Sequence, residues 1–337
     1  MGNKDYTIKD IARMSGFSVR TVSRVLNNEK YVKDETREKI QQVLEETGFR
    51  RNIFAKNLRK KAMNNILVLI EKQESIYPGQ WYTNILQHFI NRGVKRGYNV
   101  FMREYLRDET RDNNGLELLY SRFVDGVIVF NISPQDPKLR AMMEAEVPFV
   151  SIGRNDVEDA PCIDTDDRNG AYLATEHLLK LGYRDIKFLV GDAGYLINQD
   201  RIDGFKEALT DYGIDPGEGV IIEGVRSFYD TRQLARDFHR QGQMPKAVFV
   251  SGDEKAFGLL KVLNDYNYDI PGEIAVMGYD NIPISEFANP SLTTVEQPVG
   301  KIVHSALDQL IALIEGEDCQ QTTCIPTRLI IRESTGG

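Results

Sequence analysis

The sequence predicts a small all-helical N-terminal domain that contains a helix-turn-helix, followed by a larger α/β body of two parallel-sheet subdomains. Three observations support this fold class. The first 50 residues show helical patterns without strand patterns. From residue 66 onward, apolar runs alternate with amphipathic helical segments in two successive sets. The chain of 337 residues is also longer than one typical folding core.

The N-terminal helices are predicted from their caps and their apolar spacing. They are expected over residues 8–14, 18–26 and 34–47. Thr7 and Ser18 are suitable N-caps for the first two helices, and Gly48 is a suitable C-cap for the third. Val22, Val25 and Leu26 form the apolar side of the second helix. Two helices joined by a short glycine-containing turn are typical of a helix-turn-helix.

The body is predicted as two sets of apolar strands separated by helices. The strands are expected over 66–70, 98–102, 125–130 and 148–152 in the first set, and over 185–191, 220–224, 247–252 and 274–280 in the second. Continuous apolar strands spaced by helices indicate parallel sheets that are covered on both faces. Two such sets predict two subdomains, with a ligand cleft at the carboxyl ends of the strands.

Composition excludes several classes of protein. With 41% hydrophobic and 27% charged residues, the chain has the balance of an ordinary soluble protein. No apolar run is long enough to cross a bilayer, and the N-terminus lacks a signal-peptide core. Three cysteines without a CxxC pair favour a reducing cytoplasm, and no histidine lies at metal-ligand spacing from a cysteine. We therefore predict a cytoplasmic protein without cofactor or metal.

The net charge of −8 hides an asymmetry along the chain. Up to Lys61 there are 15 basic and 8 acidic residues, a net charge of +7, so the remainder carries −15. No acidic residue lies between Glu46 and Glu71. A basic, helix-rich segment attached to an acidic body indicates that the segment binds a polyanion.

The chain resembles the lactose-repressor/galactose-repressor family of bacterial transcriptional regulators along essentially its whole length. The N-terminal match is TIKDIARMSGFSVRTVSRVLNN with VKDETREKIQQVLEETGFRRNIFAKNLR, and the body carries IGR, GAYLATEHLLKLGYRDI, RIDGF, VMGYDN, LTTVEQP and RLIIREST. The resemblance implies a repressor with a periplasmic-binding-protein-like body whose chain crosses three times between subdomains. The expected domains are a headpiece (1–50), a hinge helix or linker (51–62) and a body (63–337), with an N-subdomain at about 63–163 and 297–326 and a C-subdomain at about 164–296 and 327–337.

The resemblance assigns the second helix to the major groove of DNA. Val19, Arg20 and Arg24 are then the base-reading residues, since arginine can bind guanine with two hydrogen bonds. The residues expected to contact phosphates are Thr7, Ser18, Thr21, Ser23 and Asn27. The alternative is that the two arginines, which lie four residues apart, are solvated or bind only phosphate.

The stretch 51–60 would be the hinge helix of the family. Asn52, Ala55 and Leu58 match its pattern, with Ala55 allowing two helices of a dimer to approach closely and Leu58 inserting into the minor groove. The alternative is that Leu58 packs on the body. Arg51 stands where the family commonly has proline, which leaves the start of this helix less pre-organised.

The resemblance also places a small-molecule effector, most simply a sugar, between the subdomains. The candidate residues are Ser75, Trp81, Tyr82, Arg201, Phe228, Asp253 and Asp280. Arg201 and Asp280 are the strongest, because charged groups bind hydroxyls well in a closed cleft. Trp81 could instead be a core residue, and Asp253 could instead cap the helix that follows it. At Gly252 the family often has a hydrogen-bonding residue such as asparagine.

Together these features predict a homodimeric repressor that binds a near-palindromic operator in double-stranded DNA and is released by a sugar. Within the family, the alternative is a corepressor-activated regulator of the purine type, or one controlled by a partner protein. More remote alternatives are a sugar-binding protein without a DNA role and a sugar-processing enzyme. The sequence has no GxGxxG after a strand, no GxxxxGK[ST], no GxSxG and no HExxH, so no enzyme is predicted.

Overall fold

The computed structural model describes residues 6–49, 62–72, 79–105, 118, 123–217 and 220–336. The chain divides into two compact units, Met1–Met63 and Asn64–Gly337, and each is described by itself. The predicted hinge residues Asn52, Ala55 and Leu58, and the predicted effector residue Ser75, lie outside the described residues.

The headpiece contains the three predicted helices. They are α1 (Ile8–Ser15), α2 (Val19–Leu26) and α3 (Asp34–Thr47). Thr7 caps α1 in a capping box with Asp10, and the Ser18 hydroxyl accepts a hydrogen bond from the Thr21 backbone at the start of α2. Gly16 ends α1 with φ 74°, a left-handed conformation that suits glycine and turns the chain sharply into α2.

The headpiece core explains why so short a segment folds. Ile11, Val22 and Ile40, one from each helix, are fully buried and form its centre, with Ala12 and Val25 beside them. Leu26 packs against this cluster from its edge. The predicted inward face of α2 is therefore confirmed, and its remaining side chains are left for other contacts.

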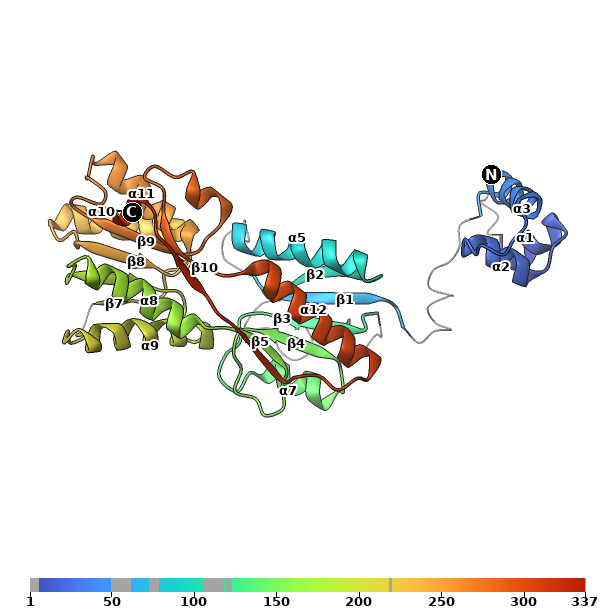
Figure 1. The fold of residues 1–337 in the computed structure, drawn as a ribbon, viewed down its shortest axis with the longest axis horizontal. Coiled ribbons are helices and arrows are strands. Elements are labelled where there is room, and N and C mark those ends of the chain that lie inside the picture. The colour runs from blue at the N-terminus through green and yellow to red at the C-terminus, as the bar shows by residue number, and fades with distance from the viewer. Residues whose placement is uncertain are drawn as a thin grey trace. The chain divides into compact units, whose positions relative to one another are not determined.

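The N-subdomain is a six-stranded sheet between two helical layers (Figure 1). Its strands are β1 (Asn65–Glu71), β2 (Asn99–Tyr105), β3 (Gly126–Val129), β4 (Phe149–Ile152), β5 (Cys162–Thr165) and β11 (Thr322–Ile325), in the order β11-β5-β4-β3-β1-β2. All of these pairs are parallel. Alternate residues of β1 face opposite layers: Ile66 and Val68 pack towards α5 (Gln80–Lys95) and α12 (Val299–Glu315), and Leu67 packs towards α7 (Pro137–Glu144).

The C-subdomain repeats this layered plan. Its strands are β6 (Ile186–Leu189), β7 (Ile221–Ile222), β8 (Ala247–Val250), β9 (Ala275–Asp280), β10 (Thr293–Glu296) and β12 (Arg328–Ile330), in the order β12-β10-β9-β8-β6-β7. Helices α8 (Asp167–Lys180) and α9 (Leu196–Asp211) cover one face, and α10 (Phe228–Gln241) and α11 (Asp253–Asp265) cover the other (Figure 1). The short β12 is antiparallel to β10, so this sheet is mostly rather than wholly parallel.

The chain crosses between the two sheets three times, as the family resemblance implies. The crossings follow β5, β10 and β11, and they lead to α8, α12 and β12 respectively. Two of them are joined directly, because the Thr327 hydroxyl donates to the Asp166 carbonyl at 3.1 Å. The crossings therefore bring residues 165–167, 297 and 327 to the junction between the subdomains. Among the residues that the structure describes, no helix is long and apolar enough to span a membrane.

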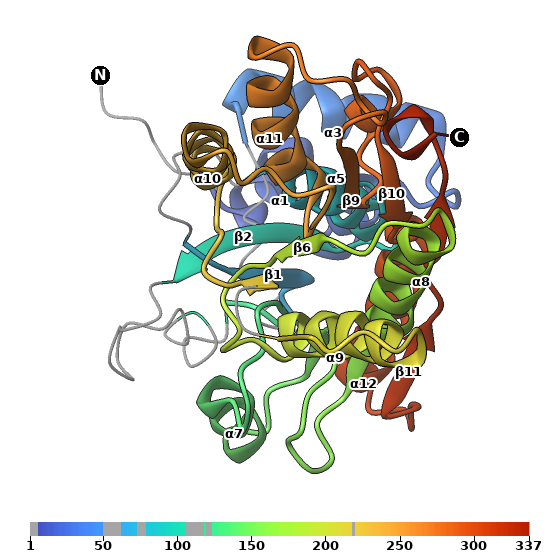
Figure 2. The same cartoon turned by 90° about the vertical axis from the view of Figure 1, so that its left-hand side faces the viewer.

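Helices α8 and α9 pack unusually closely (Figure 2). A Cβ atom added at Gly204 of α9 would lie 1.9 Å from the Arg168 carbonyl oxygen and 3.0 Å from the Tyr172 amide nitrogen, both in the backbone of α8. Backbone atoms cannot move aside as a flexible side chain can. Gly204 is therefore required for the contact that supports the first residues of α8, which lie at the subdomain junction.

Replacing Gly204 with alanine should lower the free energy of unfolding by about 3 kcal/mol, because α8 and α9 must separate. Urea unfolding followed by circular dichroism measures this effect. The matched control is Gly300→Ala in α12, where an added Cβ meets nothing within 4 Å. That change should be neutral or stabilise by up to about 1 kcal/mol. Equal stability of the two variants would contradict the close approach.

Candidate functional site

The exposed face of α2 carries the three predicted base-reading residues. Val19 is 42% exposed although it is apolar, and Arg20 beside it is exposed, while Val22 and Val25 face the core. The Arg24 side chain is 43% exposed and lies 3.6 Å from the Glu29 carboxylate. An exposed ion pair of this kind contributes little, so Arg24 can exchange Glu29 for another partner.

The hydroxyl residues predicted to contact phosphate already have local partners. The Thr7 hydroxyl donates to the Asp10 carboxylate at 2.7 Å, and the Ser18 and Thr21 hydroxyls lie 2.9 Å apart. These bonds hold the side chains at the N-terminal ends of α1 and α2. Backbone N–H groups at a helix N-terminus attract anions, so the ends of both helices suit phosphate groups. Ser23 is half-buried, and Asn27 lies at the C-cap of α2.

A cavity of about 50 Å³ lies between the two subdomains. Its lining residues are Trp81, Tyr82, Phe130, Asn131, Ile132, Ile152, Gly153, Arg154, Thr165, Ile197 and Gln297. Small-molecule sites usually measure at least about 300 Å³, so a ligand of sugar size requires the subdomains to move apart or side chains to rearrange. The cavity lies at the carboxyl ends of parallel strands, where the sequence predicts a cleft.

Aromatic rings form one wall of the cavity. Trp81, Tyr82 and Phe130 meet edge to face, with ring centroids 5.1 to 5.9 Å apart. The Tyr82 hydroxyl donates to the Asn131 side chain at 2.8 Å, which fixes the ring at the cavity edge. Trp81 packs on the N-subdomain core, the alternative role considered for it, and it also lines the cavity. Its buried Nε1 has no hydrogen-bond acceptor among the described residues.

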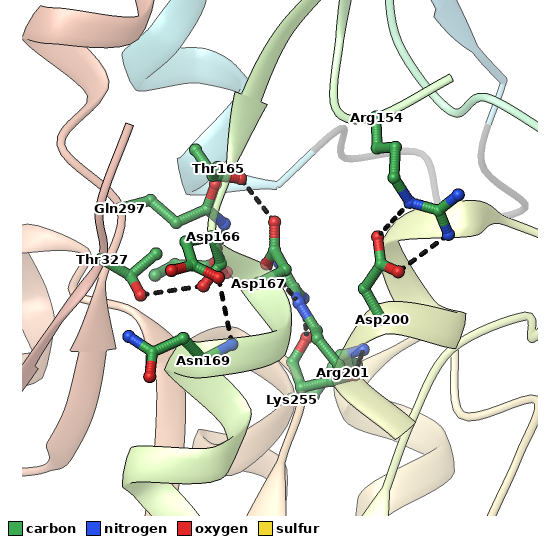
Figure 3. A network of polar contacts seen from close by, with 12 residues as sticks. Arg154, Thr165, Asp166, Asp167, Asn169, Asp200, Arg201, Lys255, Gln297 and Thr327 are labelled. Carbon is green, nitrogen blue, oxygen red and sulfur yellow. Dashed lines mark hydrogen bonds and ion pairs between the residues drawn. The ribbon is translucent and has the colours of Figure 1, made fainter. Parts of the chain in front are cut away.

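Arg201 is held in the floor of the C-subdomain by a buried ion pair. Its Nε donates to the Asp167 carboxylate at 2.8 Å, and its Nη1 donates to the Ser251 carbonyl at 3.3 Å (Figure 3). The guanidinium also lies 3.8 Å from the centre of the Tyr279 ring. Only 5% of Arg201 is exposed, and it is not among the residues that line the cavity.

Asp280 lies at the end of β9 with an unusual backbone. Its φ of 110° is a conformation that L-residues rarely adopt, and such strain is often found at functional sites. The Gln297 side chain, which lines the cavity, donates to the Asp280 carboxylate at 2.7 Å. Burial raises the pKa of Asp280 to about 7. The residue is half-buried and is not among those that line the cavity.

Asp253 has a structural role that the sequence analysis did not predict. The alternative that it caps α11 is wrong, because Gly252 is the N-cap and no side chain caps that helix. The Asp253 carboxylate is fully buried and accepts hydrogen bonds from the Ile282 amide and the Ser285 and Thr294 hydroxyls, at 2.6 to 3.0 Å. These contacts join α11 to the chain after β9 and to β10, and they leave neither oxygen for an effector.

Phe228 is not among the residues that line the cavity. It is the half-buried first residue of α10, and its ring lies 4.1 Å from the Tyr229 ring. Several contacts that the sequence does not predict bridge the subdomains. Arg154 at the end of β4 donates two hydrogen bonds to Asp200 of α9, at 2.8 and 2.9 Å (Figure 3). Arg154 belongs to the IGR motif, and the motif alone does not indicate a role for this arginine.

Two further contacts bridge the subdomains away from this ion pair. The backbone amide of Gln80 donates to the Glu254 carboxylate at 2.7 Å, and the backbone amide of Leu196 donates to the Ile132 carbonyl at 2.9 Å. Because the two subdomains are in direct contact at these separate places, they are closed against each other. This agrees with the small volume of the cavity between them. Within the described ranges, no group of three or more histidine, cysteine, aspartate or glutamate side chains is placed to hold a metal ion.

Comparison with known families matches both parts of the chain. Residues 7–52 match the model of bacterial regulatory proteins of the lacI family, and residues 175–335 match the model of the periplasmic binding protein-like domain. The first match covers the helix-turn-helix, and the second covers most of the C-subdomain together with α12.

Known proteins resemble the chain over nearly its full length. The HTH-type transcriptional repressor PurR of Vibrio atlanticus (strain LGP32) is 29% identical over 334 residues, which cover 98% of both chains. The crystal structure of the lac repressor dimer bound to operator and the anti-inducer ONPF superposes with a TM-score of 0.85 at 26% identity, covering 98% of this chain and 99% of that one. A complex of the transcriptional regulator CelR with cellobiose gives 0.72 at 25% identity, with the same coverage.

Proposed function

Because this chain belongs to the lacI family of bacterial regulatory proteins and is a DNA-binding transcriptional regulator rather than an enzyme, we propose that it is a homodimeric repressor of carbohydrate utilisation. Its headpieces bind a near-palindromic operator, and a small sugar between the subdomains releases them. The observation that carries this proposal is the exposed Arg20 and Arg24 face of α2 in the same chain as a cavity between two subdomains.

We propose that α2 lies in the major groove with its N-terminal half towards the base edges. Val19 and Arg20 are at that end and point away from the headpiece core. Arginine can bind guanine O6 and N7 together, and a valine methyl can contact the methyl group of thymine. Phosphate contacts from the ends of α1 and α2 position the helix without reading sequence.

Replacing Arg20 with alanine should weaken binding to the preferred operator by about 2 kcal/mol, because a base contact is lost. Binding to unrelated DNA should change far less. Fluorescence anisotropy with a near-palindromic operator library measures both. The control is Arg13→Ala, which removes an arginine that is 78% exposed at the end of α1. Equal losses on operator and unrelated DNA would mean that Arg20 binds only phosphate.

The homodimer in this proposal is supported by an apolar surface on the N-subdomain. Strand β2 is an edge strand, and its Phe101 and Met102 are 39% and 49% exposed. On the helix that packs beside it, Val94 is 65% exposed. Exposed apolar residues on a sheet edge are a liability in a monomer and suit a contact with a second copy. A near-palindromic operator also requires two headpieces related by two-fold symmetry.

Replacing Val94 with aspartate should convert the dimer into a monomer, because a charge would be buried without a partner at the interface. Sedimentation velocity gives the assembly state, and operator affinity should fall with it. Leu181→Asp is the control, since Leu181 is 48% exposed at the end of α8, on the other subdomain. A Val94→Asp protein that remains dimeric would place the interface elsewhere.

We propose that the sugar stacks on the aromatic wall and donates its hydroxyls to Asp280. Trp81 and Tyr82 offer apolar faces to the cavity, and Gln297 offers a polar group. Asp280 lies behind Gln297, from whose side chain it accepts a hydrogen bond, and becomes reachable when the subdomains move apart. Since the cavity is small in the closed arrangement, binding changes the angle between subdomains. Such coupling to DNA affinity is usually about 1–3 kcal/mol.

A sugar that binds in the cavity should change the fluorescence of Trp81, the only tryptophan in the chain, and should release the operator at the same concentrations. Asp280→Asn should weaken this sugar by about tenfold or more, because a charge-assisted hydrogen bond is lost. The control is Asp265→Asn, an exposed change at the end of α11. If the ligand strengthened operator binding, the protein would be a corepressor-activated regulator instead.

A further inference from the structure

Lys255, in the first turn of α11, has an ammonium group without a carboxylate partner in the part of the chain that the structure describes. Its Nζ donates to the Ser251 hydroxyl at 2.8 Å and to the Val225 carbonyl at 3.3 Å. No carboxylate among the described residues lies within 4.0 Å of it. Burial and the positive charge of Arg201 lower the pKa of Lys255 to about 8. A third N–H of this ammonium is available to a further acceptor.

The Lys255 side chain occupies the space where a side chain at position 252 would lie. A Cβ added at Gly252 would come 2.9 Å from Lys255 Cε and 3.7 Å from its Nζ. The same point is 3.6 Å from the Asp280 carboxylate. The φ of Gly252 is 162°, an extended conformation open to any residue, so the backbone does not require glycine. The lysine thus fills a place beside Asp280 that glycine leaves open.

Lys255 and Asp280 carry opposite charges and both lie near the point where a Cβ at Gly252 would stand. Arg201 is neutralised by Asp167, and Arg154 by Asp200 (Figure 3). Within the described ranges Asp280 has no cation within 4.0 Å and is bound only by the neutral Gln297 amide. One positive and one negative group therefore remain near the same point without forming an ion pair with each other.

We propose that Lys255 is a specificity-determining residue of the effector site and that it binds, together with Asp280, a hydroxyl group of an uncharged sugar. This inference rests on the proposed function and names the chemistry of the same site. A sugar hydroxyl donates to the carboxylate and accepts from the ammonium, so both charge-assisted bonds form at once. A phosphate or carboxylate on the ligand would gain from Lys255 but be repelled by Asp280, which disfavours sugar phosphates and sugar acids.

The test compares Lys255→Met with Lys261→Met in the full-length protein. Methionine keeps the length of the side chain and removes its charge, and Lys261 is a 61% exposed lysine on the same helix. Calorimetry and Trp81 fluorescence are recorded with a panel of uncharged mono- and disaccharides that includes ribose and cellobiose, and with glucose 6-phosphate and gluconate. We expect an uncharged sugar to bind, with its affinity lowered at least about tenfold by Lys255→Met and changed less than about twofold by Lys261→Met.

A rescue variant separates ligand binding from folding. Adding Gly252→Asn to Lys255→Met places an amide in the vacated space, and this should restore part of the lost sugar affinity. Circular dichroism and the melting temperature of each variant identify any that is unfolded. Unchanged affinity in a folded Lys255→Met protein would overturn the inference. So would binding of only the charged ligands, or of no uncharged sugar.

Operator binding is measured in the same samples, so that the two proposals fail separately. If a sugar binds through Lys255 but does not alter operator affinity, the proposed mechanism of release is wrong and the role of Lys255 stands. If a sugar releases the operator equally in wild type and Lys255→Met, the release mechanism stands and the role of Lys255 is wrong.

Discussion

The buried ion pair between Arg201 and Asp167 organises the junction on which the effector site depends. Asp167 begins α8 directly after the first crossing, and the Thr165 hydroxyl donates to its second oxygen. Arg201 brings α9 to this point and reaches the end of β8 through the Ser251 carbonyl. Burying two charges is costly unless hydrogen bonds satisfy them, and here each group has a further partner besides the other, the Ser251 carbonyl for Arg201 and the Thr165 hydroxyl for Asp167. The pair thus positions Tyr279 and, one residue further on, Asp280.

The structure explains why the local parts of the fold could be predicted. Helix α1 begins and ends at caps that are visible in the sequence, α3 ends at the visible cap Gly48, and strands such as β1 are continuous apolar runs. Strand β5 (CIDT) and strand β10 (TTVE) were not predicted, because polar residues and threonine interrupt their apolar pattern. Both strands precede crossings, where their polar side chains form the junction.

The candidate site could be predicted only where one residue type implies one role. The exposed arginines of α2 follow from the helical spacing alone. Asp253 looked like a ligand or a cap, but its partners at 282, 285 and 294 are about thirty to forty residues away in the chain. Lys255 and the Arg154–Asp200 pair carry no motif of their own, since their roles arise from long-range packing. The contacts of Lys255 form within the C-subdomain, and the Arg154–Asp200 pair forms only where both subdomains meet.

The ion pair between Arg154 and Asp200 links the closed arrangement to the composition of the solvent. The Arg154 side chain is 41% exposed, so mobile ions can screen this bridge between subdomains. Salt also weakens the contacts of a basic headpiece with DNA phosphates. Binding releases counterions from the DNA, and this release is less favourable at higher salt concentration. Ionic strength therefore acts on this protein at two places, the basic headpiece and the bridge between the subdomains. The salt dependence of operator binding is therefore the sum of both effects. Comparing it with the salt dependence of a variant without the Arg154 charge separates them.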